Sequence, residues 1–260
     1  MKKESTIEQG QGRLVYGIHA VKELLQFHPE KIHKLFVQEH QNLPASHVLL
    51  PFLTLAQKAN IPVIHKNKLE LNHLCPGTHQ GIVALCDEFS YLSLEELIQQ
   101  TQTNSPTGFL MALDGVTDPQ NLGTLLRSLY ALGGNGLILP QDRSALITPA
   151  AIKAAAGATE HIPVAKVKNL ARSLETLKEN GYWVYGASLN KTAVSPWKHD
   201  FKRQTVIVLG SEGKGLRPLI LECCDGHICI PMVGENTSLN VAISGAILLY
   251  EALRQKNVKP

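Results

Sequence analysis

The fold class follows from one stretch of the sequence, Val206-Ile-Val-Leu-Gly-Ser-Glu-Gly-Lys-Gly-Leu216. Its first four residues are all apolar, so both faces of this strand have to be covered. Continuous apolar strands of this kind are typical of parallel sheets that carry helices on both sides. The three glycines that follow the strand let backbone N–H groups approach a ligand closely. The stretch therefore predicts an α/β domain with a parallel sheet and a ligand-binding loop at the end of one strand.

Around this stretch, from residue 108 to residue 260, apolar strands and amphipathic helices alternate, which predicts one α/β domain. The expected strands cover residues 109–113, 137–139, 183–185, 206–209 and 228–230. The expected helices cover residues 121–132, 149–156, 170–180 and 239–254.

A second, smaller α/β unit is expected over residues 13–88, after a disordered tail at 1–12. Its expected helices are 17–27 and 48–59, the latter interrupted near Pro51, and its expected strands are 32–37, 61–64 and 81–86. Residues 89–107 are interpreted as a linker, because a short helix at 92–100 is followed by a Ser/Thr/Asn/Pro-rich run.

The composition excludes several classes of protein. With 44% hydrophobic and 18% charged residues over 260 positions, the chain is neither disordered nor collagen-like nor a coiled coil. The longest apolar run, 241–250, is interrupted by Ser244 and Gly245 and is much shorter than the roughly 20 residues of a membrane span. The basic N-terminus is not followed by an apolar stretch, so we expect no secretory signal, no membrane association and a cytoplasmic location. The net charge of +3 does not by itself indicate a nucleic-acid-binding protein.

The five cysteines indicate neither disulfides nor a metal site. Their number is odd, and Cys223, Cys224 and Cys229 do not form paired Cys-x-x-Cys arms. We interpret them as small buried apolar side chains and expect no bound metal.

The first stretch with candidate chemistry is Asp114-Gly-Val-Thr-Asp-Pro-Gln-Asn-Leu-Gly-Thr-Leu-Leu-Arg127. It follows an apolar strand and opens a helix, with Pro119 in the loop and Asn121 in the N-cap position. Gly123 and Arg127 are four residues apart and share a helix face. Two interpretations stay open: an ordinary capped helix with a surface arginine, or a helix start against which a ligand lies.

Two further stretches carry polar residues beyond what the fold requires. The glycine loop after residue 209 matches neither a Walker A loop nor the dinucleotide fingerprint. Glu212 within it would repel a phosphate, so a neutral or cationic ligand fits better. The third stretch, residues 228–246, joins a strand to an apolar helix through a polar loop. Asn236 or Ser238 is expected to cap that helix, but the loop contains more polar residues than one cap needs.

These three stretches, in this order, resemble the SpoU family of the SPOUT class, whose members are S-adenosylmethionine-dependent RNA 2'-O-ribose methyltransferases. Asn121 and Arg127 match the first family motif, Gly210 to Gly215 the second and Asn236 to Asn240 the third. Residues 140–145 and 153–160 also look like the family. The N-terminal unit, with Val15-Tyr-Gly-Ile-His-Ala-Val21, is similar to the L30e-like RNA-binding domain of bacterial 23S rRNA guanosine 2'-O-methyltransferases.

The resemblance implies a trefoil-knotted C-terminal domain, a rare exception to the usual rules of chain threading. It implies S-adenosylmethionine as methyl donor and a guanosine ribose of 23S rRNA, in the peptidyl transferase region, as acceptor. The substrate would be 23S rRNA or a ribosome assembly intermediate, and the enzyme a homodimer with its site at the subunit interface.

The resemblance also implies roles for individual residues. Residues that would hold the methyl donor are Gly210, Ile230 and Leu239 through backbone contacts, Met232 as part of an apolar bed, and Glu212 near the sulfonium charge. Residues that would serve catalysis are Arg127, Asn121, Glu212, Ser238 and Asn240. Arg127 would activate the ribose 2'-hydroxyl, and since arginine rarely loses its proton we favour stabilisation of the developing alkoxide by its charge.

Three alternatives remain at this point. The chain could methylate a tRNA ribose instead, or bind RNA without catalysis. A nicotinamide-dependent dehydrogenase is the remaining α/β interpretation, and the missing glycine fingerprint argues against it.

Overall fold

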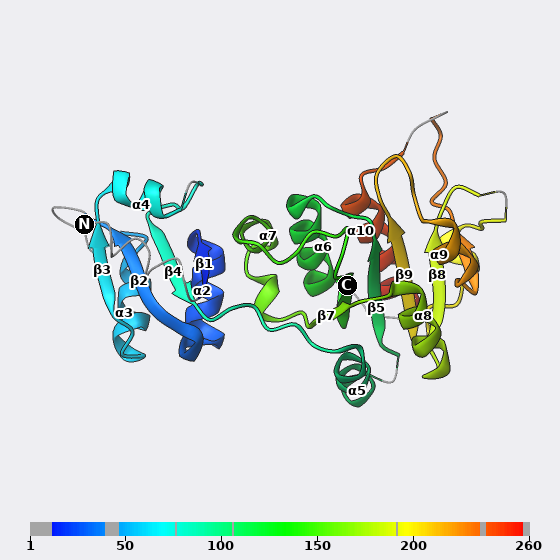
Figure 1. Ribbon diagram of the computed structural model, residues 1–260, viewed down its shortest axis with the longest axis horizontal. Coiled ribbons are helices and arrows are strands. Elements are labelled where there is room, and N and C mark those ends of the chain that lie inside the picture. Colours follow the sequence, from blue (N-terminus) through cyan, green and yellow to red (C-terminus); the bar gives the residue numbers. More distant parts are fainter. Residues whose placement is uncertain are drawn as a thin grey trace. The chain divides into compact units, whose positions relative to one another are not determined.

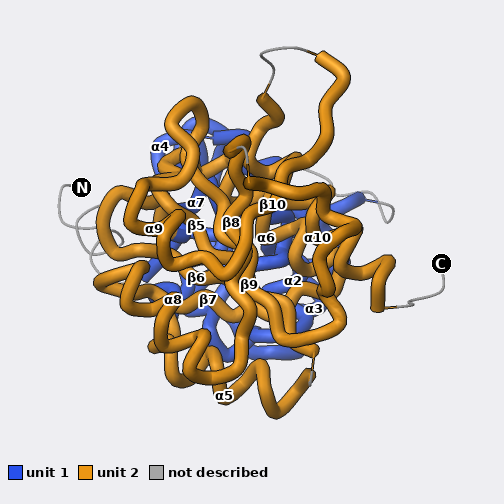
Figure 2. The backbone as a smooth tube through the Cα atoms, turned by 90° about the vertical axis from the view of Figure 1, so that its right-hand side faces the viewer, with its two compact units in different colours: residues 1–90, 147–160 blue, residues 91–146, 161–260 orange. Residues whose placement is uncertain are grey.

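The computed structural model describes residues 12–39, 47–75, 77–105, 107–190, 192–234 and 238–256. The chain divides into two compact units. Unit 1 comprises residues 1–90 and 147–160, and unit 2 comprises residues 91–146 and 161–260, coloured blue and orange in Figure 2. The expected tail at residues 1–12 lies outside the described residues except for Gly12.

Unit 1 is built on a four-stranded sheet in the order β1-β4-β2-β3. Strand β4 is antiparallel to both of its neighbours, whereas β2 and β3 are parallel. Its elements are β1 (Arg13–Tyr16), α2 (Ile18–Phe27), η1 (Pro29–Lys31), β2 (Ile32–Gln38), α3 (Leu50–Lys58), β3 (Val63–Lys66), α4 (Lys68–Leu74) and β4 (Ile82–Cys86). This confirms the small α/β unit that we expected at the N-terminus.

One segment of the C-terminal part of the sequence belongs to unit 1. The helices α7 (Pro149–Ala155) and η2 (Ala158–Glu160) lie in residues 147–160, and α7 contacts β1 and α2. Glu160 forms a buried ion pair with Arg13, at 2.9 Å between carboxylate and guanidinium. No pattern in the sequence indicated that residues 147–160 belong to unit 1.

Unit 2 is built on a six-stranded sheet in the order β10-β8-β9-β5-β6-β7, with every neighbouring pair parallel. The strands are β5 (Phe109–Asp114), β6 (Gly136–Pro140), β7 (Val164–Val167), β8 (Trp183–Ala187), β9 (Thr205–Gly210) and β10 (Gly226–Ile228). The helices are α5 (Leu94–Asn104), α6 (Pro119–Ala131), α8 (Leu170–Glu179), η3 (Pro196–Lys198), α9 (Pro218–Glu222) and α10 (Val241–Gln255) (Figure 1). The parallel α/β sheet that the sequence predicted is confirmed.

Strand β9 is covered on both faces, as its composition indicated. Val206 and Val208 belong to the apolar cluster that contains residues of α5, α8 and α9. Leu209 and Met111 point to the opposite face, where α6 and α10 pack against each other. A Cβ atom on Gly245 of α10 would lie 2.4 Å from the Leu125 side chain, so this glycine permits the close approach of the two helices.

Several element boundaries differ from our expectations. Strand β10 ends at Ile228 rather than Ile230. Helix α5 ends at Asn104, past the expected end at residue 100. The interpretation of residues 89–107 as a linker is wrong for this helix, because its side chains Leu94, Leu97 and Ile98 are buried in the unit 2 core. The short elements β7, α4 and α9 were not expected, since each contains too few residues for a periodic pattern to show. Among the described residues, no helix combines the length and the apolar character needed to cross a membrane. The trefoil threading of the chain stays a prediction.

Candidate functional site

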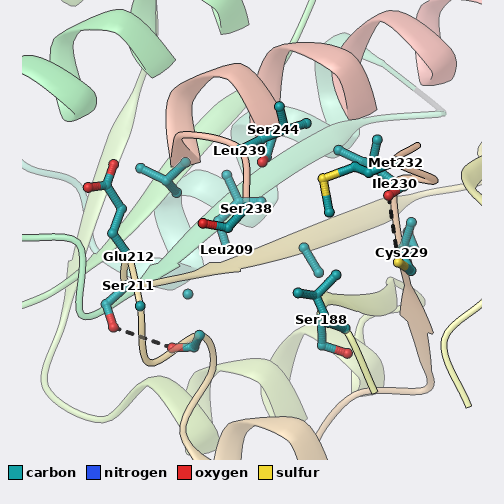
Figure 3. Close-up of a pocket in the computed structure, with 17 residues that line it drawn as sticks. Ser188, Leu209, Ser211, Glu212, Cys229, Ile230, Met232, Ser238, Leu239 and Ser244 are labelled. Carbon is teal, nitrogen blue, oxygen red and sulfur yellow. Dashed lines mark hydrogen bonds between the residues drawn. The ribbon is translucent and has the colours of Figure 1, made fainter. Parts of the chain in front are cut away.

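A pocket of about 250 Å³ lies in unit 2 where the carboxyl ends of β8, β9 and β10 meet the start of α10. Ligand sites in parallel α/β sheets typically form at this edge. Apolar side chains make up much of its lining: Leu189, Leu209, Ile228, Ile230, Met232, Leu239 and Val241. Figure 3 shows Ile230 and Met232 on one side of the pocket and Glu212 on the opposite side. The pocket thus combines an apolar interior with a carboxylate at one end.

The loop after β9 is folded tightly against the end of its own strand. Backbone bonds join Ser211 and Gly215 in both directions, at 3.2 Å and 2.9 Å. A Cβ atom on Gly210 would lie 2.2 Å from the Gly215 carbonyl carbon, so a side chain has no room at this position. Gly213 and Gly215 adopt positive φ values of 79° and 65°, which favour glycine. The glycines therefore form a narrow turn that brings backbone groups to the pocket wall.

Three side chains from the three predicted motifs form one hydrogen-bonded cluster at the pocket rim. The Glu212 carboxylate oxygen Oε1 accepts hydrogen bonds from the amides of Asn121, at 3.0 Å, and Asn240, at 2.8 Å. The Asn240 amide nitrogen also donates to Asn121 Oδ1 at 2.8 Å. These hydrogen bonds join side chains that lie 91 and 119 positions apart in the sequence. The sequence motifs meet at one place, with a carboxylate at its centre.

The orientation of the Asn240 amide is set by its second task as the N-cap of α10. Its oxygen accepts hydrogen bonds from the backbone N–H groups of Ala242 and Ile243, at 2.9 Å and 3.3 Å. The nitrogen must therefore point toward Glu212, because one amide presents its acceptor and its donors at opposite ends. The expectation that Asn236 or Ser238 caps this helix is wrong for Ser238. Asn236 lies outside the described residues.

Asn121 is not the cap of α6 that the sequence indicated. Asp118 takes that position, with its carboxylate oxygens accepting from the N–H groups of Gln120 and Asn121. The helix begins two residues earlier than expected because Pro119, which has no N–H to satisfy, fits its first turn rather than the preceding loop. This earlier cap leaves the Asn121 side chain free to bond Glu212.

Two predicted catalytic residues, Arg127 and Ser238, are not part of the hydrogen-bonded cluster. Arg127 is exposed on α6, and no hydrogen bond or ion pair connects it to the described part of the chain. Six residues separate it from Asn121, a rotation of about 240° on a helix, so the two side chains leave α6 in different directions. Ser238, in contrast, lines the pocket.

All five residues predicted to hold the methyl donor line this pocket: Gly210, Glu212, Ile230, Met232 and Leu239. The sequence reasoning missed the contribution of β8, since Ser188 and Leu189 follow this strand and also line the pocket. Their stretch contains no glycine run or polar cluster, and only the position of β8 beside β9 places them there.

The nearby cysteine Cys224 has no catalytic character. Burial raises the pKa of its thiol to about 12, and the thiol hydrogen-bonds the Ile220 carbonyl. It fills the space beside Gly186 of β8. Cys224 and Cys229 are only partly buried, so the expectation that all five cysteines are buried side chains is confirmed for Cys75, Cys86 and Cys223 alone.

Comparison with known proteins agrees with this geometry. The model of the SpoU rRNA Methylase family matches residues 108–250, and a model described as RNA 2'-O ribose methyltransferase substrate binding matches residues 14–92. The 23S rRNA (guanosine-2'-O-)-methyltransferase RlmB of Pseudomonas putida is 40% identical over 248 residues, covering 94% of this chain and 97% of that protein. A putative TrmH family tRNA/rRNA methyltransferase of Bacillus subtilis is 36% identical, covering 94% and 96%.

Solved structures share the fold. The SpoU methyltransferase AviRb of Streptomyces viridochromogenes aligns with a TM-score of 0.78 at 21% identity, covering 98% of this chain and 93% of that one. An AdoMet-bound rRNA methyltransferase of Sinorhizobium meliloti aligns with a TM-score of 0.77 at 23% identity, covering 98% and 90%. With a family model over more than half of its length and relatives similar over nearly all of it, the chain belongs to the SpoU rRNA Methylase family.

Proposed function

We propose that this protein transfers a methyl group from S-adenosylmethionine to the ribose 2'-hydroxyl of a guanosine in 23S rRNA, in the peptidyl transferase region. The observation that carries the proposal is the cluster of Asn121, Glu212 and Asn240 at the rim of the pocket. It unites the three family motifs, and relatives named for this reaction are about 40% identical over nearly the whole chain. Membership of this family excludes the nicotinamide-dependent dehydrogenase.

The pocket fits the methyl donor in its chemistry. An adenine ring suits the apolar lining formed by Ile230, Met232 and Leu239, and the backbone around Gly210 offers polar partners. Glu212 supplies a carboxylate at the pocket wall for a cationic ligand. We assign these five residues to donor binding. Bound there, S-adenosylmethionine supplies a methyl group activated by its sulfonium sulfur.

The protein's own task is to orient the ribose and favour transfer of its 2'-proton to solvent water as the methyl–oxygen bond forms and the methyl–sulfur bond breaks, since a neutral hydroxyl is a poor nucleophile. Arg127 would stabilise the developing negative charge on the oxygen, because a guanidinium keeps its proton in proteins. Asn121 and Asn240 would hold Glu212 and the rim in place, and Ser238 would orient the ribose. Holding two reactants in line can supply about 7–11 kcal/mol, so few chemical groups are needed.

We also propose a homodimer with its active site at the subunit interface. Helix α10 exposes an apolar stripe at helical spacing, with Ile243 52%, Ile247 38% and Tyr250 61% accessible. Exposed apolar patches of this kind are typical of protein interfaces. The Arg127 side chain leaves α6 away from the rim cluster of its own chain. In a dimer, Arg127 of one chain would instead reach the pocket of the second chain.

The N-terminal unit would engage the RNA, as the family model for substrate binding suggests. The natural substrate would then be 23S rRNA or a ribosome assembly intermediate in the cytoplasm. A tRNA substrate is the alternative that the test below distinguishes.

The test is methyl transfer from labelled S-adenosylmethionine to transcribed 23S rRNA and to tRNA, followed by mapping of the modified ribose. We expect one methylated guanosine in 23S rRNA. Arg127→Ala should abolish transfer without changing donor affinity or melting temperature, whereas Arg127→Lys, which keeps the charge, should retain part of the rate. Lys202→Ala removes an exposed cation of unit 2 outside the pocket lining and serves as the control. Full activity of Arg127→Ala, or transfer to tRNA alone, would overturn the proposal.

A further inference from the structure

A second cavity, of about 380 Å³, lies in unit 2 at the carboxyl ends of β6 and β7. The proposed reaction does not use it. Three cationic side chains, Arg143, Lys168 and Arg217, line it together with one carboxylate, Asp142. The first residues of α8 and part of α9 complete the wall.

Arg217 is held rigidly by a buried carboxylate. Its Nε donates to Asp114 Oδ1 at 2.6 Å, and its backbone N–H donates to Asp114 Oδ2 at 2.8 Å. The Asp114 side chain is fully buried at the end of β5, whereas half of the Arg217 side chain is accessible. This bond uses Nε and leaves the two terminal nitrogens of the guanidinium for a ligand. These two nitrogens can donate parallel hydrogen bonds to two oxygens of a phosphate.

The rest of the cavity also favours an anion. Helix α8 has ten residues, and its N-cap Asn169 and first residues Leu170 and Ala171 line the cavity, so the positive end of the helix dipole lies at this wall. The Asn169 side chain takes up the N–H of Arg172, while the described residues offer no acceptor to the N–H groups of Leu170 and Ala171.

The charges of the cavity leave an excess of positive potential. Arg143 and Lys168 are exposed and form no ion pair with the described residues. The carboxylate of Asp114 neutralises Arg217, and that of Asp142 neutralises one of the two exposed cations. One positive charge and the partial positive charge of the helix N-terminus then have no negative counterpart.

The second cavity and the methyl-donor pocket share a loop. Asp114 pairs with Gly210 in the register of β5 and β9, so both cavities open at the same sheet edge. Ser211 to Gly215 contribute to the first pocket, and Arg217, two residues further on, lines the second. An anion bound to Arg217 therefore lies next to the segment that forms the wall of the donor pocket.

We propose that this cavity binds backbone phosphate of the substrate RNA and holds the strand beside the methyl-donor pocket. The proposal rests on the function proposed above, since it takes RNA as the substrate. Phosphate contacts fix the register of a nucleic acid without reading its sequence. The cavity would accordingly position the target ribose, and Arg143, Lys168 and Arg217 would be positioning residues.

The test compares four full-length proteins on transcribed 23S rRNA: the wild type, Arg143→Ala/Lys168→Ala, Asp142→Asn and the control Lys198→Ala/Lys202→Ala. The control removes two exposed lysines of unit 2 that do not line the cavity. We expect the first double variant to raise KM for RNA roughly tenfold, as for two exposed ionic contacts. In the double variant, the plot of log RNA affinity against log salt concentration should be less steep by about 1.4, as for two lost phosphate contacts on a single strand. The kcat and the affinity for S-adenosylmethionine should be unchanged. Asp142→Asn should lower KM, an opposite effect that a merely structural role would not produce.

Each other outcome overturns the proposal. A wild-type KM and salt slope in the double variant would mean that no phosphate binds there. Equal loss of donor affinity would indicate damage to the loop instead. A defect seen only on protein-containing ribosomal particles, and not on naked RNA, would identify a protein as the occupant. If the wild type itself methylates no RNA, the proposed function fails. RNA binding by the same variants, measured without turnover, then still tests whether the cavity binds phosphate.

Discussion

Replacing Gly210 by alanine tests the pocket geometry most directly. The added Cβ would lie 2.2 Å from the Gly215 carbonyl carbon, 2.4 Å from the Leu216 nitrogen and 2.5 Å from the Gly215 oxygen. All three are backbone atoms, so no side chain can rotate away. To reach the 3.4 Å of an ordinary contact, the loop must move by about 1.2 Å.

This displacement should damage function more than stability. Overpacking of this kind costs about 2 kcal/mol, which lowers the melting temperature of a chain this size by about 6 °C. A shift of about 1 Å at a reactive site can reduce the rate about 100-fold. Because the displaced segment lines the donor pocket, we expect S-adenosylmethionine affinity to fall at least tenfold.

The assay pairs calorimetric titration of S-adenosylmethionine with thermal unfolding. Gly181→Ala is the matched control: its φ of 85° makes alanine strained, by about 1–2 kcal/mol, but no atom lies within 4 Å of the new Cβ. It should lower the melting temperature without changing donor affinity. Donor binding by Gly210→Ala at the wild-type affinity would refute the assignment of the loop after β9 to the donor pocket.

Two further predictions concern titratable groups. Cys229 lines the donor pocket, so S-adenosylmethionine should slow its alkylation at pH 8, while Cys86 and Cys224, whose thiol pKa is raised by burial to about 12, should stay unlabelled with or without it. Mass spectrometry of the labelled cysteines checks this, and labelling of Cys229 that ignores the donor would contradict it. Burial holds the pKa of His199 below its ordinary value of 6.5, so the unfolded chain takes up the proton more readily. The stability it contributes is therefore complete above pH 6.5 and is lost as the pH falls below it. The melting temperature of His199→Gln should fall less between pH 7 and pH 5 than that of the wild type, and parallel curves would count against this cause.

The sequence by itself determined that unit 2 contains a parallel sheet covered by helices, with its polar loops at one edge. The apolar run at 206–209 required cover on both faces, and a parallel sheet between helices is the arrangement that supplies it. Parallel strands place their carboxyl ends at one edge, so the polar loops that follow β5, β9 and β10 were bound to lie near one another. The residues predicted to hold the methyl donor all line one pocket for this reason.

The tertiary structure alone decided which side chains touch. Strand order places Ser188 and Leu189 in the pocket, and neither residue stands out in the sequence. Local sequence did not reveal that Asp118 caps α6, which frees Asn121 to bond Glu212. Asp114 and Arg217, which form an ion pair, lie 103 positions apart in the sequence. Contacts at such separations depend on how strands pair rather than on any periodic pattern. Periodicity and motifs report what each segment must bury or bind, whereas the partner of each side chain is set by the packing of segments distant in the chain.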